Sequence, residues 1–109
     1  MIADDIRAAI AKRISTESEW DYGMQQCWKE ETAILLKDIN ETVDFIANDC
    51  TDEELSWLSE VFEDIAEASK ESRRIIDAAE KRAASFENDK EKQNIRFEID
   101  LARYILDNE

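Results

Sequence analysis

Hydrophobic residues in this sequence recur at steps of three and four, the spacing that places side chains on one face of an α-helix. The apolar stripes predict a first helix over residues 2–14 and a long second helix from about residue 17 to 49. A third helix is expected from residue 52 to a junction at 69–72, and a fourth carries the apolar positions from 75 to 86. We therefore expect an all-α fold in which about five helices pack as antiparallel hairpins.

Three segments have the spacing of a capping box, in which a side-chain oxygen and a carboxylate three residues later bind amides that the first helical turn leaves unpaired. The clearest is Thr51–Glu54, which also places three carboxylates in the first turn. The same spacing occurs at Thr16–Glu19 and Asn88–Glu91. These signals predict that helices start near residues 17, 52 and 89.

The last helix, expected to end near residue 106, is apolar on two faces. They carry Ile95, Ile99, Ala102 and Leu106 on one side, and Phe97, Leu101 and Tyr104 on the other. One neighbouring helix cannot cover both faces, so the helix either lies centrally or offers a contact surface, for example to a second copy of the chain.

Several residues outside the main stripes are also expected inside the fold. Trp20, Tyr22 and Trp28 cluster near the start of the second helix, where aromatic spacing is ordinarily structural. Cys27 and Cys50 are the only cysteines, and we expect two buried, reduced thiols.

Composition indicates one folded domain, residues 1–109, with a strong negative charge. The chain has 28 acidic and 14 basic residues, a formal net charge of −14, and 43% hydrophobic residues, too many for a disordered acidic tail. Such charge repels DNA, RNA and anionic membranes and favours a basic protein partner. No stretch approaches the ~20 apolar residues that span a bilayer, and no signal sequence is recognisable, so the cytoplasm is the expected location.

The acidity is concentrated between Lys37 and Lys70, where no basic residue occurs. Within this segment Trp57 falls at the margin of the apolar stripe, beside several carboxylates, so it is either an aromatic anchor for a partner or packed at the core boundary with Val61. The candidate partner-binding residues are Asp38, Glu41, Asp44, Phe45, Asp49, Glu53, Trp57, Glu60, Glu63, Asp64 and Glu67.

Catalytic chemistry has few candidate residues in this chain. There is no histidine, so the commonest general base and metal ligand is missing, and two isolated cysteines cannot make a structural zinc site. A single glycine cannot build a phosphate-binding loop. We expect no enzymatic activity, no bound metal and no cofactor.

Three segments resemble small helical immunity proteins of bacterial contact-dependent growth inhibition systems. They are 21–28 (DYGMQQCW), 38–46 (DINETVDFI) and 50–62 (CTDEELSWLSEVF), and the similarity extends over roughly residues 20–68. The resemblance implies a cytoplasmic protein that binds and blocks the C-terminal toxin domain, commonly a nuclease, delivered by a neighbouring cell.

Two other functions use the same features. An inhibitor that mimics nucleic acid would present its carboxylates to a DNA- or RNA-binding protein. A helical adaptor or oligomerisation subunit would pair through Phe97, Leu101 and Tyr104 of the last helix. The spacing of the carboxylates and the molar mass in solution distinguish these alternatives.

Overall fold

The computed structural model describes residues 2–16, 19 and 21–108, and this part of the chain is helical, with no β-strand. The α-helices, in chain order, are α1 (Ile2–Ser15), α2 (Asp21–Lys37), α3 (Ile39–Asp44), α4 (Asp52–Leu58), α5 (Phe62–Ala68), α6 (Arg73–Ala83) and α7 (Asp89–Asp107). A π-helical turn, Phe45–Asp49, continues α3, and 3-10 turns at Ser59–Val61 and Lys70–Ser72 precede α5 and α6. The expected all-α class is confirmed.

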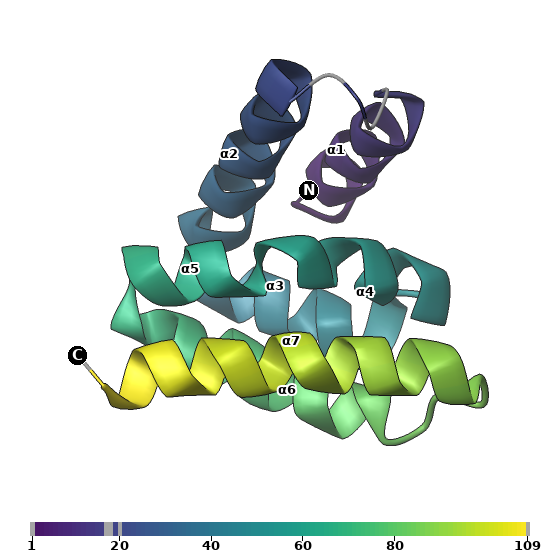
Figure 1. Cartoon of the computed structure of the whole chain (residues 1–109), viewed down its shortest axis with the longest axis vertical. Helices are drawn as coiled ribbons and strands as arrows, with labels where there is room; N and C mark the ends of the chain where they lie inside the picture. Colours follow the sequence, from purple (N-terminus) through teal and green to yellow (C-terminus); the bar gives the residue numbers. More distant parts are fainter. Residues whose placement is uncertain (1, 17–18, 20, 109) are drawn as a thin grey trace.

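The helices form two groups (Figure 1). The α1–α2 pair lies at one end of the molecule, across the other helices. In the remainder, α4 and α5 lie beside α7 on the near side of the view, while α3 and α6 lie behind them. The α5–α7 contact is the most extensive one between helices, although these helices are not adjacent in sequence.

The predicted long helix from residue 17 to 49 is wrong, because the chain leaves the helix at Asp38. This residue is extended (φ −143°, ψ 98°), and its carboxylate accepts a hydrogen bond from the Glu41 amide, so it caps α3. The buried Thr42 hydroxyl donates to the Leu35 carbonyl oxygen at 2.7 Å and ties α3 back to the end of α2. The apolar stripe continues through the break because both helices face the same core.

The predicted capping box at Thr16 is also wrong. The Thr16 hydroxyl donates to the Lys12 carbonyl oxygen at 2.8 Å, so it terminates α1 instead of starting α2. Residues 17 and 18, where the second helix was expected to begin, lie outside the described part of the chain, as does Trp20.

The other two predicted caps are confirmed. The Thr51 hydroxyl accepts from the Glu54 amide at 3.1 Å, and the Glu54 carboxylate accepts from the Thr51 amide at 2.8 Å. Asn88 caps α7 by accepting from the Glu91 amide at 3.0 Å. The third expected helix begins at Asp52 as predicted, but the 3-10 turn at Ser59–Val61 divides it into α4 and α5.

One core joins all the helices. The side chains with at most 1% exposure include Leu35, Ile46, Leu55, Leu58, Phe62, Ile65, Ile75, Ile76, Ile95 and Ile99. Cys27 and Cys50 are buried and free, as expected. Tyr22 was expected inside but is exposed, and Ile14, the last residue of the predicted first helix, is also exposed.

Helix α7 buries one of its two apolar faces. Ile95, Ile99, Ala102 and Leu106 are in the core, whereas Phe97 is 62% exposed and Tyr104 68% exposed. The second face is therefore open in the single chain. None of the described helices is long and apolar enough to cross a membrane.

We predict that Thr51→Ala lowers the free energy of unfolding by about 1 kcal/mol, because it removes the N-cap oxygen of α4. Urea denaturation followed by circular dichroism measures the change. Thr16→Ala is the matched control and should change stability much less, since Thr16 is not an N-cap. Equal losses for the two variants would contradict this account of where the helices begin.

Candidate functional site

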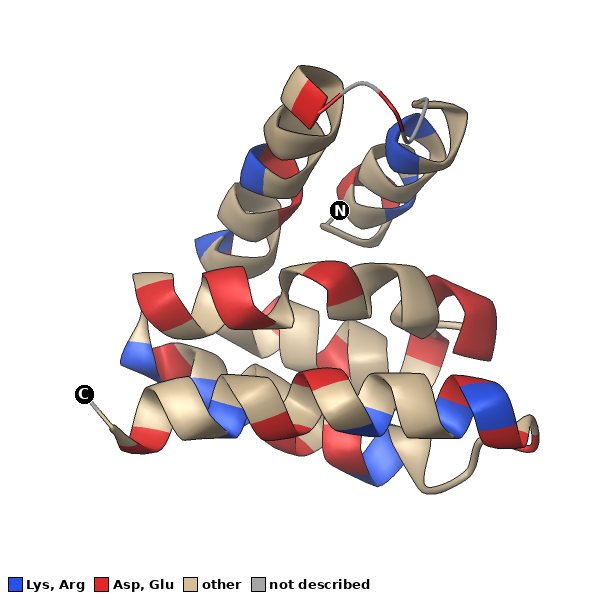
Figure 2. Cartoon of the chain, viewed as in Figure 1, with Lys and Arg blue, Asp and Glu red and all other residues tan. Residues whose placement is uncertain are grey.

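The acidic residues predicted to bind a partner do not form a single patch. Those of α3 and the π-helical turn lie beside α6, where a groove is lined by Arg74, Lys81 and Arg82 together with Val43 and Ala47. Those of α5 lie beside α2 and α7. Figure 2 shows red positions without blue ones along α4 and α5, and mixed colours on α7.

On the α3 side, the predicted residues have partly structural roles. Asp38 caps α3, and the Asp44 carboxylate accepts a hydrogen bond from the Asn48 side chain at 2.8 Å. Glu41, Asp49 and Glu53 are exposed. Basic residues of α6 border this side, so it is less negatively charged than the sequence of the acidic segment alone suggested.

Phe45, one of the predicted binding residues, lies in the core and not on the surface. Its side chain is 1% exposed and belongs to the core, with the Arg7 guanidinium 5.1 Å from the ring centroid. A partner could not touch this ring without local unfolding.

Trp57 is partly buried and packs against the core. Its ring lies under the guanidinium of Arg13 from α1, 5.2 Å from the centroid. This geometry agrees with the second interpretation of Trp57, packing at the boundary of the core. One face of its ring already contacts Arg13 within the chain.

Glu60 is tied to two other helices. The guanidinium of Arg13, which is 5% exposed, donates from Nε and Nη2 to the two Glu60 carboxylate oxygens, both at 2.9 Å. The Trp28 indole Nε1 donates to Glu60 Oε1 at 3.3 Å. These two charge-assisted hydrogen bonds hold the α1–α2 pair against the 3-10 turn that precedes α5. Glu60 is therefore largely a structural residue.

Glu31 is a buried acid that the sequence analysis did not single out. It is 1% exposed, and neither carboxylate oxygen has a hydrogen-bond partner among the described residues. Burial, reinforced by the nearby negative charge of Glu60, raises the pKa of Glu31 to about 8. The side chain is therefore mostly protonated at neutral pH. The sequence did contain a signal of this burial, because Glu31 lies four residues from both Cys27 and Leu35, which are buried on the same face of α2.

The remaining acids of α5 form a cluster with one acid from α7. We call Glu63, Asp64, Glu67 and Glu98 the α5 acidic cluster; within the described part of the chain none of them is in an ion pair. Partial burial raises the pKa of Asp64, with further increases from Glu67 and Glu63. Partial burial also raises the pKa of Glu98, helped by Glu63, Glu60 and Asp64. Among the described residues, the cluster therefore holds negative charge that no ion pair offsets.

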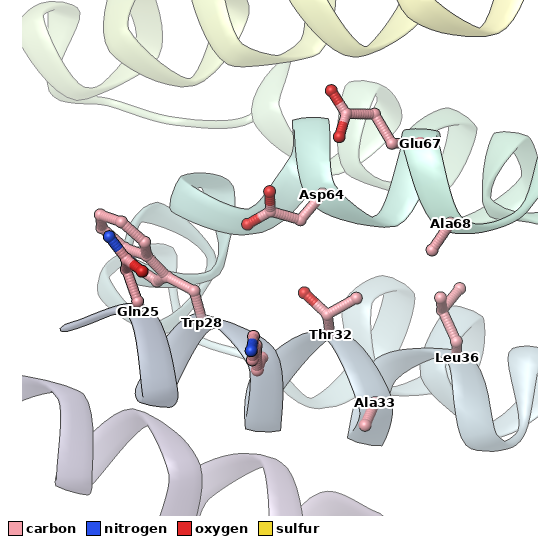
Figure 3. Close-up of a pocket in the computed structure, with 9 residues that line it drawn as sticks. Gln25, Trp28, Thr32, Ala33, Leu36, Asp64, Glu67 and Ala68 are labelled. Atoms are coloured by element: carbon pink, nitrogen blue, oxygen red, sulfur yellow. The ribbon is translucent and has the colours of Figure 1, made fainter. Parts of the chain in front are cut away.

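Two grooves border this cluster. The first, of about 640 Å³, lies between α2 and α5 and is drawn in Figure 3. The second, of about 460 Å³, runs between the start of α5 and α7, and includes Glu63, Phe97 and Glu98. Trp28 lines both grooves, so they adjoin at its ring.

In contrast, several arginines of the last two helices are in ion pairs. Arg96 pairs with Glu80 at 2.9 Å, Arg73 with Asp107 at 2.9 Å, and Arg103 with both Asp77 and Glu80. These ion pairs agree with the near balance of charges at residues 70–109.

Comparison of the chain with protein-family models, curated proteins and solved structures finds no significant match. Among the described residues, no group of three or more His, Cys, Asp or Glu side chains could hold a metal ion. The function is therefore argued from the α5 acidic cluster and its grooves.

We predict that Glu60→Gln lowers the free energy of unfolding by about 2 kcal/mol, because it leaves the buried Arg13 guanidinium without a counter-charge. Chemical denaturation measures the loss. Lys12→Met, which breaks the exposed Lys12–Glu30 ion pair, is the control and should have little effect. A Glu60→Gln variant as stable as wild type would show that the pair does not hold the α1–α2 pair in place.

We predict that Glu31→Gln removes a pH dependence of stability. The pKa of Glu31 is higher in the folded chain than in the unfolded one, so the folded chain holds the extra proton, and stability falls as pH rises toward about 8. Relative to Glu31→Gln, wild type should lose up to ~1.4 kcal/mol per pH unit between about pH 5 and 8. Urea titrations at several pH values measure this difference, and parallel profiles for the two proteins would contradict it.

Proposed function

We propose that this chain is an immunity-type protein that binds and neutralises a basic toxin domain through the α5 acidic cluster. The observation that carries the proposal is the concentration of unpaired carboxylates on α5 and α7, beside two grooves and the exposed ring of Phe97. The sequence resemblance to immunity proteins of contact-dependent growth inhibition supports the same class of partner.

The charge of the cluster suits a nuclease domain as the partner. Nucleases hold phosphates with basic residues, so a surface of unpaired carboxylates is complementary to them and speeds their encounter. Partial burial raises the pKa values of Asp64 and Glu98, and repulsion from neighbouring carboxylates raises them further. A cationic partner would relieve that repulsion, so part of the binding free energy comes from removing an unfavourable interaction.

The aromatic contact in this proposal shifts from Trp57 to Phe97. Phe97 is 62% exposed, lines the groove beside Glu98, and has acidic neighbours, whereas Trp57 is stacked on Arg13. Exposed aromatic residues surrounded by polar groups are common at the centre of protein interfaces.

One observation favours a second candidate function, self-association. Phe97 and Tyr104 are both exposed on α7 and could pair with a second copy of the chain. Light scattering tests this second function, because a monomeric free chain would exclude self-association through Phe97 and Tyr104.

The proposed function is tested by co-expression with a candidate toxin domain, namely the C-terminal domain of any large secreted protein whose gene ends just upstream of this one. We expect the chain to restore growth that this domain arrests, and the purified proteins to form a complex. A complex that forms equally well with unrelated DNA-binding proteins, and that duplex DNA displaces, would instead support nucleic-acid mimicry. No complex and no protection would refute the proposal.

We predict that the double change Glu63→Lys and Glu67→Lys lowers the association rate with the toxin domain about tenfold at low salt, through loss of electrostatic attraction. The matched control, Glu41→Lys with Asp44→Lys, alters net charge equally but on the α3 side. Stopped-flow kinetics from about 50 to about 500 mM salt measure the effect, since ions screen exposed charges over this range. Salt-independent rates, or equal effects of the two double changes, would contradict a role for this cluster.

A further inference from the structure

The groove between α2 and α5 combines an apolar floor with acidic side chains. Figure 3 shows Thr32 and Leu36 of α2 projecting toward α5, and Ala68 of α5 projecting toward Leu36. The Asp64 carboxylate lies over the groove on the side of Trp28, whereas Glu67 also lines the groove but projects from α5 away from α2. An occupant that fits this groove needs an apolar part at the Leu36 end and a cation at the Trp28 end.

Two polar groups in the groove lack a partner. The Thr32 hydroxyl oxygen is buried without a hydrogen bond, although it lines the groove. Asp64 has no cation within ion-pair distance among the described residues. Buried or half-buried polar atoms normally find partners in folded proteins, so donors from another molecule would complete this site.

The aromatic wall favours arginine over lysine as the cationic group. A guanidinium can stack on an indole ring while its N–H groups donate to a carboxylate, whereas an ammonium is a compact, strongly hydrated charge. The methylene groups of an arginine side chain also pack well on apolar residues such as Leu36 and Ala68.

Resting on the proposed function, we propose that the groove between α2 and α5 binds an arginine of the basic partner, with neighbouring apolar residues of the same segment over Leu36 and Ala68. The guanidinium lies between the Trp28 ring and the Asp64 carboxylate, which accepts its N–H groups. Charge complementarity selects this occupant, because an apolar segment alone would leave Asp64 and Glu67 unpaired at the groove.

One cation of the chain itself stands close to this site. Lys29 is exposed and lines the groove, but it forms no ion pair with Asp64 or Glu67 among the described residues. Its charge should oppose entry of an arginine, so Lys29→Ala should strengthen binding. A purely apolar occupant would not gain from this change.

The test uses an amphipathic helical peptide of about 15 residues, long enough for partial helicity, built from Leu, Ala and Gln with a single central Arg. A matched peptide carries citrulline, which has the same shape without the charge. The readouts are chemical-shift changes at the Trp28 indole N–H and the Thr32 amide. We expect the arginine peptide to bind about tenfold more tightly than the citrulline peptide, as for a charge-assisted pair in a partly dry site.

Three variants test the assignment of residues. Asp64→Asn should abolish the preference for arginine and should still fold, because it relieves repulsion within the α5 acidic cluster. Glu41→Gln, on the α3 side, should leave the preference unchanged, and Lys29→Ala should increase the affinity for the arginine peptide. Equal binding of the two peptides, no shift at Trp28 and Thr32, or equal weakening by Asp64→Asn and Glu41→Gln would overturn the proposal.

The toxin domain separates this inference from the proposed function. If the domain binds and Asp64→Asn does not weaken the complex, the groove inference fails while the immunity-type function stands. If the domain does not bind but the arginine peptide occupies the groove, the proposed function fails and the groove remains a site for an arginine-bearing segment of another partner.

Discussion

The bidentate contact between Arg13 and Glu60 determines how the two groups of helices meet. It joins α1 to the turn before α5, and the indole of Trp28 adds α2 to the same carboxylate. Both walls of the α2–α5 groove depend on this contact, because one wall belongs to the α1–α2 pair and the other to α5. The Arg13–Glu60 ion pair stabilises the fold, and in doing so it also sets the shape of the surface that we propose to bind the partner.

The distribution of charge follows from which acids have internal partners. Glu60, Glu54 and Glu80 are each held by arginines, so they contribute to the fold. Among the residues that the structure describes, no arginine or lysine pairs with the α5 acidic cluster, and its members repel one another. Such a surface is less favourable for the stability of the free chain than a mixed one, which is the expected trade-off when charge serves binding instead of folding.

Local signals in the sequence predicted the helices and two of their caps. Contacts between distant segments could not be predicted from such local signals. Even the break at Asp38 had a local signal, since Asp38 and Glu41 have the same spacing as Thr51 and Glu54. The position of Glu98 beside α5 had none, because it depends on the packing of α7 against α5. Phe45 was misassigned because it was grouped with the acidic residues around it, although it lies three residues after Thr42 and directly before Ile46, both of which face the core.

The buried carboxyl of Glu31 means that folding of this chain takes up a proton at neutral pH. The folded molecule then carries less negative charge than its formula implies, because Glu31 holds a proton. The charge of Asp64 helps to raise the pKa of Glu31, so a basic partner that places a cation beside Asp64 would favour release of the Glu31 proton into solution. The heat of complex formation should then include the ionisation heat of the surrounding buffer, so calorimetry in two buffers would report on protonation as well as on contacts.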